Sequence, residues 1–131
     1  MLEKNPDTVK VVYKNFPLRS HRMALPAAMA ALAAHEQGKF WEYHDKIFEN
    51  NNYKKLTQEM LVDFARELKL DVDKFQKNMR SPQIQQQVAR DFNDGRLAGV
   101  GGTPTLFVDG MKVKSRSPQG IQMLIDKALK K

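Results

Sequence analysis

The sequence predicts an α/β fold, in which one strand is followed by a block of helices, a β-hairpin and a final helix. Residues 8–14 are β-branched and aromatic, which is typical of a strand. Asp109-Gly110 separates the apolar runs 105–108 and 111–114, a strong signal for a two-residue hairpin turn. Ser117-Pro118 then favours the start of a helix, because serine caps helices and proline suits their first position.

The helical block is expected to begin at Ser20, which can cap a helix through the alanine-rich stretch to about Gln37. His21 would then lie in the first turn of this helix. Gly38 is expected to end it, since glycine adopts the left-handed conformation common at helix C-termini. Pro26 falls inside the predicted helix and should kink it.

Four further helices are predicted before the hairpin. One runs from Phe40 to about Asn50, where a cluster of three asparagines breaks it. The N-cap residues that predict the next three helices are Thr57, Asp71 and Ser81. The last of them runs over residues 83–97.

Composition restricts the classes of function. The chain has 131 residues, of which 41% are hydrophobic, so it fits one globular domain. It contains no cysteine, which excludes disulfides, thiolate catalysis and thiolate metal sites. The 22 Lys and Arg against 15 Asp and Glu give a net charge of +7, but these residues are scattered, so we expect a solvated surface rather than a nucleic-acid interface. No apolar run has transmembrane length, and the charged residues 1–14 show no signal peptide.

No catalytic or metal-binding group is expected. The three histidines, His21, His35 and His44, are not spaced to share a metal ion, and no carboxylate cluster joins them. His44-Asp45 is not expected to act as a base and its orienting acid, since neighbouring helix residues do not face each other. His44 is instead predicted to pack beside Trp41 and Phe48. No cofactor is expected, because the glycine run 99–102 lacks the lysine of a phosphate-binding loop.

The order of these elements and their residues resembles the DsbA-like thioredoxin-fold family of thiol-disulfide oxidoreductases. The likeness runs from Leu2 to about Leu129. The stretches that carry it are 9–18, His21 with 24–28, 37–45 and 94–110, the last of which contains Gly99-Val100-Gly101-Gly102-Thr103-Pro104-Thr105 and the hairpin.

The resemblance implies an incomplete thioredoxin-like fold, as one truncated domain over residues 1–131 with a helical insertion at about 39–97. In the family, a strand ending in Cys-x-x-Cys opens a helix that leads to a segment like residues 2–6, so this chain is expected to begin after that strand. The family places the strand between those corresponding to residues 8–14 and 105–108. We expect compensation, either by direct pairing of these two strands or by an edge from a second copy.

The resemblance also implies the site. Gly102, Thr103, Pro104 and Thr105 correspond to the cis-proline loop, which binds extended or unfolded polypeptide substrates. One hypothesis is a member or fragment of a DsbA-like disulfide oxidoreductase, itself redox-inactive. The alternative is a non-catalytic peptide-binding or dimerisation module, with homodimers formed through exposed strand edges. The family is found in the cell envelope or periplasm.

Overall fold

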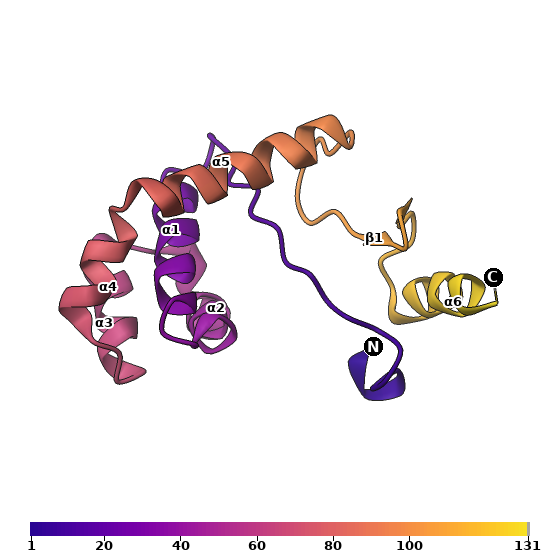
Figure 1. The fold of residues 1–131 in the computed structure, drawn as a ribbon, viewed down its shortest axis with the longest axis horizontal. Helices are drawn as coiled ribbons and strands as arrows, with labels where there is room; N and C mark the ends of the chain where they lie inside the picture. Colours follow the sequence, from indigo (N-terminus) through magenta and orange to yellow (C-terminus); the bar gives the residue numbers. More distant parts are fainter. Residues whose placement is uncertain (131) are drawn as a thin grey trace. The chain divides into compact units, whose positions relative to one another are not determined.

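The computed structural model describes residues 1–130, which form two compact units (Figure 1). The helical unit comprises Lys14–Ala98. The hairpin unit comprises Met1–Tyr13 together with the chain from Gly99 onward. The assignment of the whole chain to one domain with an insertion at 39–97 stays a prediction.

In the helical unit, the helices pack around α1. Their bounds are α1 Ala24–His35, α2 Phe40–Phe48, the 3-10 helix η2 Glu49–Lys54, α3 Gln58–Glu67, α4 Val72–Met79 and α5 Pro82–Leu97. Helix α1 contacts α2, α3, α4 and α5. Its alanine-rich sequence explains this central place, since small side chains let neighbouring helices approach closely.

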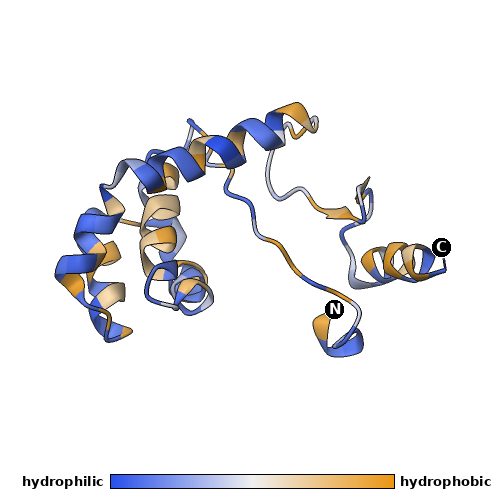
Figure 2. Ribbon diagram, viewed as in Figure 1, coloured by the Kyte–Doolittle hydropathy of each residue, from blue (hydrophilic) through white to orange (hydrophobic). Residues whose placement is uncertain are grey.

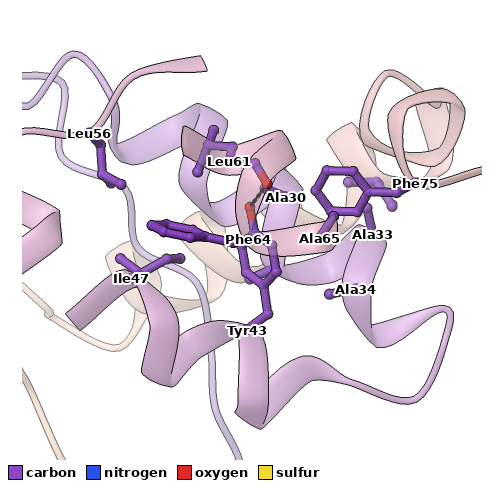
Figure 3. Close-up of a cluster of buried hydrophobic side chains, with 12 residues drawn as sticks. Ala30, Ala33, Ala34, Tyr43, Ile47, Leu56, Leu61, Phe64, Ala65 and Phe75 are labelled. Atoms are coloured by element: carbon purple, nitrogen blue, oxygen red, sulfur yellow. Dashed lines mark hydrogen bonds between the residues drawn. The ribbon is translucent and has the colours of Figure 1, made fainter. Parts of the chain in front are cut away.

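Aromatic side chains from α2, α3 and α4 fill the core against the alanines of α1 (Figure 3). Tyr43 is fully buried, with its ring centroid 6.0 Å from that of Phe64 and 5.6 Å from that of Phe75. Its hydroxyl donates a 2.8 Å hydrogen bond to the Leu61 carbonyl. This bond satisfies the polar end of an otherwise apolar side chain in the core.

Side-chain caps begin three helices where the sequence predicts them. The cap bonds run to Thr57 Oγ1 from the Met60 N–H (3.2 Å), to Asp71 Oδ1 from the Lys74 N–H (3.1 Å) and to Ser81 Oγ from the Ile84 N–H (3.3 Å). Each cap accepts from one of the first helical N–H groups, which have no acceptor within the helix. The three predicted N-caps are therefore confirmed.

The start of α1 differs from the expectation. The helix begins at Ala24, and Ser20 and His21 lie in the preceding turn, where the His21 carbonyl accepts from the Ala24 N–H at 3.0 Å. The predicted Ser20 cap and the helical placement of His21 are therefore wrong. Because of the later start, Pro26 lies in the first turn, where an N–H would have no helical acceptor. Helix α1 continues past Pro26 to His35.

The predicted ends of α1 and α2 are confirmed by backbone conformation. Gly38 has a φ of 76°, and its N–H donates to the His35 carbonyl at 2.9 Å. Asn50 and Asn51, with φ of 53° and 59°, interrupt the right-handed helical conformation after α2. Asparagine tolerates this left-handed region better than most residues.

A polar seam fixes the first residues of the helical unit to α5. Asp91 is buried, and its carboxylate accepts from the Asn15 N–H (3.1 Å), the Asn15 side-chain amide (2.9 Å) and the Gln87 side-chain amide (2.8 Å). The rings of Phe16 and Phe92 stack beside this seam with centroids 4.5 Å apart. The buried carboxylate is thus provided with three donors.

The predicted β-hairpin is present in the hairpin unit. Strands β1 (Phe107–Val108) and β2 (Met111–Lys112) pair antiparallel, with Phe107 opposite Lys112. A bond from the Val113 N–H to the Leu106 carbonyl, 2.8 Å long, extends the ladder. Asp109 and Gly110 have φ of 50° and 83°, the left-handed pair that a type I′ turn requires.

Helix α6 (Pro118–Leu129) packs against β1 and also holds the start of the chain. Ser117 caps it as predicted, accepting from the Gly120 N–H at 3.0 Å. Asn5, which follows the 3-10 helix η1 (Leu2–Lys4), exchanges two amide hydrogen bonds with Gln122, of 2.8 and 3.1 Å. Residues 1–5 are therefore tied to α6.

Residues 8–14 form no strand, which corrects the prediction made from their side chains. In the part of the chain that the structure describes, the sheet consists of β1 and β2 alone. The predicted pairing of residues 8–14 with 105–108 is therefore not formed. Val11 and Val12 are 40% and 66% exposed, and the segment is coloured as partly hydrophobic in Figure 2. Strand propensity produces a strand only where a sheet offers hydrogen bonds and burial.

Candidate functional site

The loop that precedes β1 contains the four residues predicted as the substrate-binding site. The peptide bond between Thr103 and Pro104 is cis. Thr103 and Pro104 are exposed, whereas Gly102 and Thr105 are half-buried. The loop therefore presents its Thr-Pro pair to solvent, and the residues on either side of the pair are less exposed.

Two side chains hold the carbonyls of this loop. Thr105 Oγ1 donates to the Gly102 carbonyl at 2.7 Å, which closes a tight turn around the Thr-Pro pair. Arg116 Nη1 donates to the Pro104 carbonyl at 2.9 Å. Among the described residues, the backbone N–H and carbonyl of Thr103 have no hydrogen-bond partner. An extended ligand can therefore pair with the backbone of Thr103.

Open space surrounds the glycines of the loop. A Cβ placed on Gly101 or Gly102 would meet no atom within 4 Å. Glycine at these positions therefore leaves room for the backbone of a bound chain to approach closely. Gly99, with a φ of 83°, is different, since it adopts a left-handed conformation that side chains disfavour.

Arg116 is the residue of this loop environment that the sequence analysis missed. The hairpin register contains a signal for it, because Phe107 pairs with Lys112 and the Val113 N–H bonds the Leu106 carbonyl. Continued along both chain segments, that register brings residue 116 opposite residue 103. Arginine there can reach the carbonyl of the next residue, Pro104.

His44 lies against aromatic rings and beside an acidic neighbour. His44 packs as predicted, with ring centroids 5.5 Å from Trp41 and 4.9 Å from Phe48. Its Nδ1 lies 3.2 Å from the Asp45 carboxylate, so the expectation that these neighbours do not meet is wrong. The short Asp45 side chain reaches the ring next to it on the helix surface. Within residues 1–130, no three His, Asp or Glu side chains are grouped to hold a metal ion.

Comparison with known proteins assigns the chain to a family. The family model described as thioredoxin matches residues 1–127, and the chain belongs to this thioredoxin family. The structure is similar to that of a thioredoxin-like oxidoreductase from Silicibacter pomeroyi DSS-3, with a TM-score of 0.76 and 26% identity over 92% of this chain and 68% of that one. The predicted thioredoxin-like α/β fold is therefore confirmed.

Two kinds of curated relative match the sequence. It is 29% identical to the probable disulfide bond formation protein D of Bacillus anthracis, over 94% of this chain and 59% of that protein. It is 36% identical to the Na(+)/H(+) antiporter NhaA 3 of Salinispora tropica, over 89% of this chain but only 18% of the antiporter. The chain thus spans a minor part of the antiporter. Among the described helices, none has the length and apolarity needed to cross a membrane.

Proposed function

We propose that this protein is a DsbA-like member of its family that binds extended or unfolded polypeptides at the loop of Gly102, Thr103, Pro104 and Thr105. The observation that supports this most is the open backbone of Thr103 between two carbonyls that are already held by Thr105 and Arg116. A polypeptide in extended conformation would add its own N–H and carbonyl groups to that backbone.

Binding without redox chemistry is part of the proposal. Thiol–disulfide exchange starts with attack by a thiolate. The sequence contains no cysteine, so this polypeptide by itself performs no such exchange. The similarity to a disulfide bond formation protein and to a thioredoxin-like oxidoreductase supports the choice of unfolded polypeptides as ligands. The antiporter similarity supports no transport function, since it covers a small share of that protein.

The test is binding of a fluorescein-labelled, uncharged twelve-residue peptide with alternating valine and threonine, measured by fluorescence anisotropy with the full chain. Gly102→Val places a branched side chain in the space that the ligand backbone would occupy. It is expected to weaken binding at least about tenfold, as the loss of two hydrogen bonds would. Gly101→Val, one residue farther from Pro104, is the matched control and should change binding less than about threefold.

Amide chemical-shift changes show where the peptide binds. The proposal requires them to centre on residues 102–105, and equal binding by wild type and Gly102→Val would refute it. An insulin-reduction assay on the same sample should show no activity above buffer. Activity in that assay would contradict the redox-inactive part of the proposal.

A second candidate function, dimerisation, is favoured by residues 8–14. This segment has strand-forming side chains but joins no sheet in the described chain, and Val12 is 66% exposed. A second copy could supply the missing edge. Sedimentation velocity over a hundredfold concentration range tests this, and Val12→Lys should abolish any dimer that forms through the segment. A monomer at all concentrations excludes this function.

A further inference from the structure

The segment that follows the hairpin turn carries a row of cations beside the candidate loop. Lys112, Lys114 and Arg116 are all exposed, and Val113 between the first two is 7% exposed. Side chains alternate between the two faces of an extended chain, so burial of Val113 places Lys112 and Lys114 on the outer face. No acidic residue lies between Gly110 and Arg116.

These cations have no acidic partner within the described residues. All ion pairs among the described residues have both partners within residues 14–94, which belong to the helical unit. In the helical unit, by contrast, Lys14, Lys39, Lys46 and Arg66 each have an acidic partner. The row in the hairpin unit keeps its positive charge available for a ligand.

Arg116 connects this row to the candidate loop. One N–H of its guanidinium is used by the Pro104 carbonyl at 2.9 Å. A guanidinium has five N–H donors in a planar fork, so further donors remain next to the loop. A carboxylate is the group that matches this fork best in a polypeptide.

We infer that the loop selects extended polypeptides that carry acidic side chains, with a ligand carboxylate held by Arg116 and the general negative charge attracted by Lys112 and Lys114. The inference rests on the proposed peptide-binding function and adds its substrate class. A nucleic acid fits less well, because residues 109–118 contain no aromatic ring on which bases could stack. The open Thr103 backbone favours a polypeptide, which can pair with it as a strand.

The test compares two labelled peptides that differ only in two aspartates replaced by asparagines. At 50 mM salt, wild type is expected to bind the acidic peptide about fivefold more tightly than the asparagine peptide. A difference of this size is what a few exposed charge pairs contribute together. The preference should fall below about twofold at 500 mM salt, where these charges are screened. The readout is the ratio of the two affinities. A variant that weakens the binding of both peptides equally therefore leaves the ratio unchanged.

Arg116→Gln is expected to reduce the ratio to below about twofold, and the Lys112→Gln, Lys114→Gln double variant gives a second, independent reduction. Lys127→Gln, which removes one exposed charge from α6, is the matched control and should keep the ratio. An unchanged ratio in the Arg116 and double variants overturns the inference, as does an equal affinity of wild type for both peptides. Tighter binding of a twelve-nucleotide thymidine strand than of the acidic peptide also overturns it.

The design separates this inference from the proposed function. Failure of the proposed function means that neither peptide binds, or that Gly102→Val leaves the binding of the neutral peptide unchanged. Failure of the inference means that both peptides bind at the loop with equal affinity. The two failures therefore give different results with the same samples.

Discussion

Replacement of Asp91 by asparagine tests the polar seam on α5. In the wild type, Asp91 Oδ2 accepts two hydrogen bonds from Asn15, at 3.1 and 2.9 Å, and Oδ1 accepts one from Gln87 at 2.8 Å. Asparagine has nearly the same shape, but an NH₂ group replaces one of the two carboxylate oxygens. Whichever way this amide turns, its NH₂ faces a donor, so at least one hydrogen bond is lost.

The expected cost follows from this geometry. In the less costly orientation, the NH₂ group faces Gln87, and Asn15 keeps both bonds. Gln87 can accept from this NH₂ only if its amide turns over, which gives up the 2.9 Å bond that its oxygen accepts from Arg90. One charge-assisted bond is then lost, and the new donor at a position 4% exposed has poor access to water. Such a change lowers the free energy of unfolding by about 2 kcal/mol. For a chain of 131 residues, this corresponds to a melting temperature lower by roughly 6–10 °C.

Asp94→Asn is the matched control, with the same chemical change three residues farther along α5. Asp94 pairs with Lys14 at 3.3 Å, and both side chains are more than half exposed, at 58% and 57%. Loss of such a surface pair costs less than about 1 kcal/mol. Both variants would be compared by urea denaturation followed by circular dichroism, at 50 and 500 mM salt. If Asp91→Asn were no more destabilising than Asp94→Asn, the argument for the seam would be wrong.

Two further predictions concern close packing and pH. Gly120→Ala would place a Cβ 2.5 Å from the Ser115 carbonyl oxygen, so it should lower the free energy of unfolding by about 1–3 kcal/mol in a thermal melt, although alanine normally favours a helix. Burial raises the pKa of the Tyr43 hydroxyl above its ordinary value of 10.0. The folded state thus keeps this proton after the unfolded state has lost it, so stability that is complete below pH 10 should fall above it. Tyr43→Phe should show a shallower fall in melting temperature between pH 9 and 11.

The elements that could be predicted are those decided by neighbouring residues. Thr57, Asp71, Ser81 and Ser117 each cap a helix through a bond to an N–H three residues ahead, and the Asp-Gly pair needs only its own backbone conformation. Such signals lie within one turn of chain. The start of α1 was misjudged because Ser20 has a suitable side chain, but the chain around it forms a turn.

Elements that depend on distant partners were predicted less well. Residues 8–14 have the composition of a strand, yet a strand requires a neighbouring chain that sequence composition does not reveal. The same limit applied to the candidate site. The Thr103–Pro104 loop could be located from its motif, whereas Arg116, twelve residues beyond Pro104, required the hairpin register to bring it to the loop.

The exposed valines of residues 8–14 also affect how the protein behaves in concentrated solution. A short β-prone stretch without proline, exposed and outside any sheet, is a site where molecules aggregate edge to edge. Lys10 lies between the valines and opposes stacking by charge repulsion, as gatekeeper residues do. High ionic strength weakens that repulsion. The protein should therefore remain colloidally stable longest at low salt, and replacement of Lys10 by a neutral residue should shorten that time.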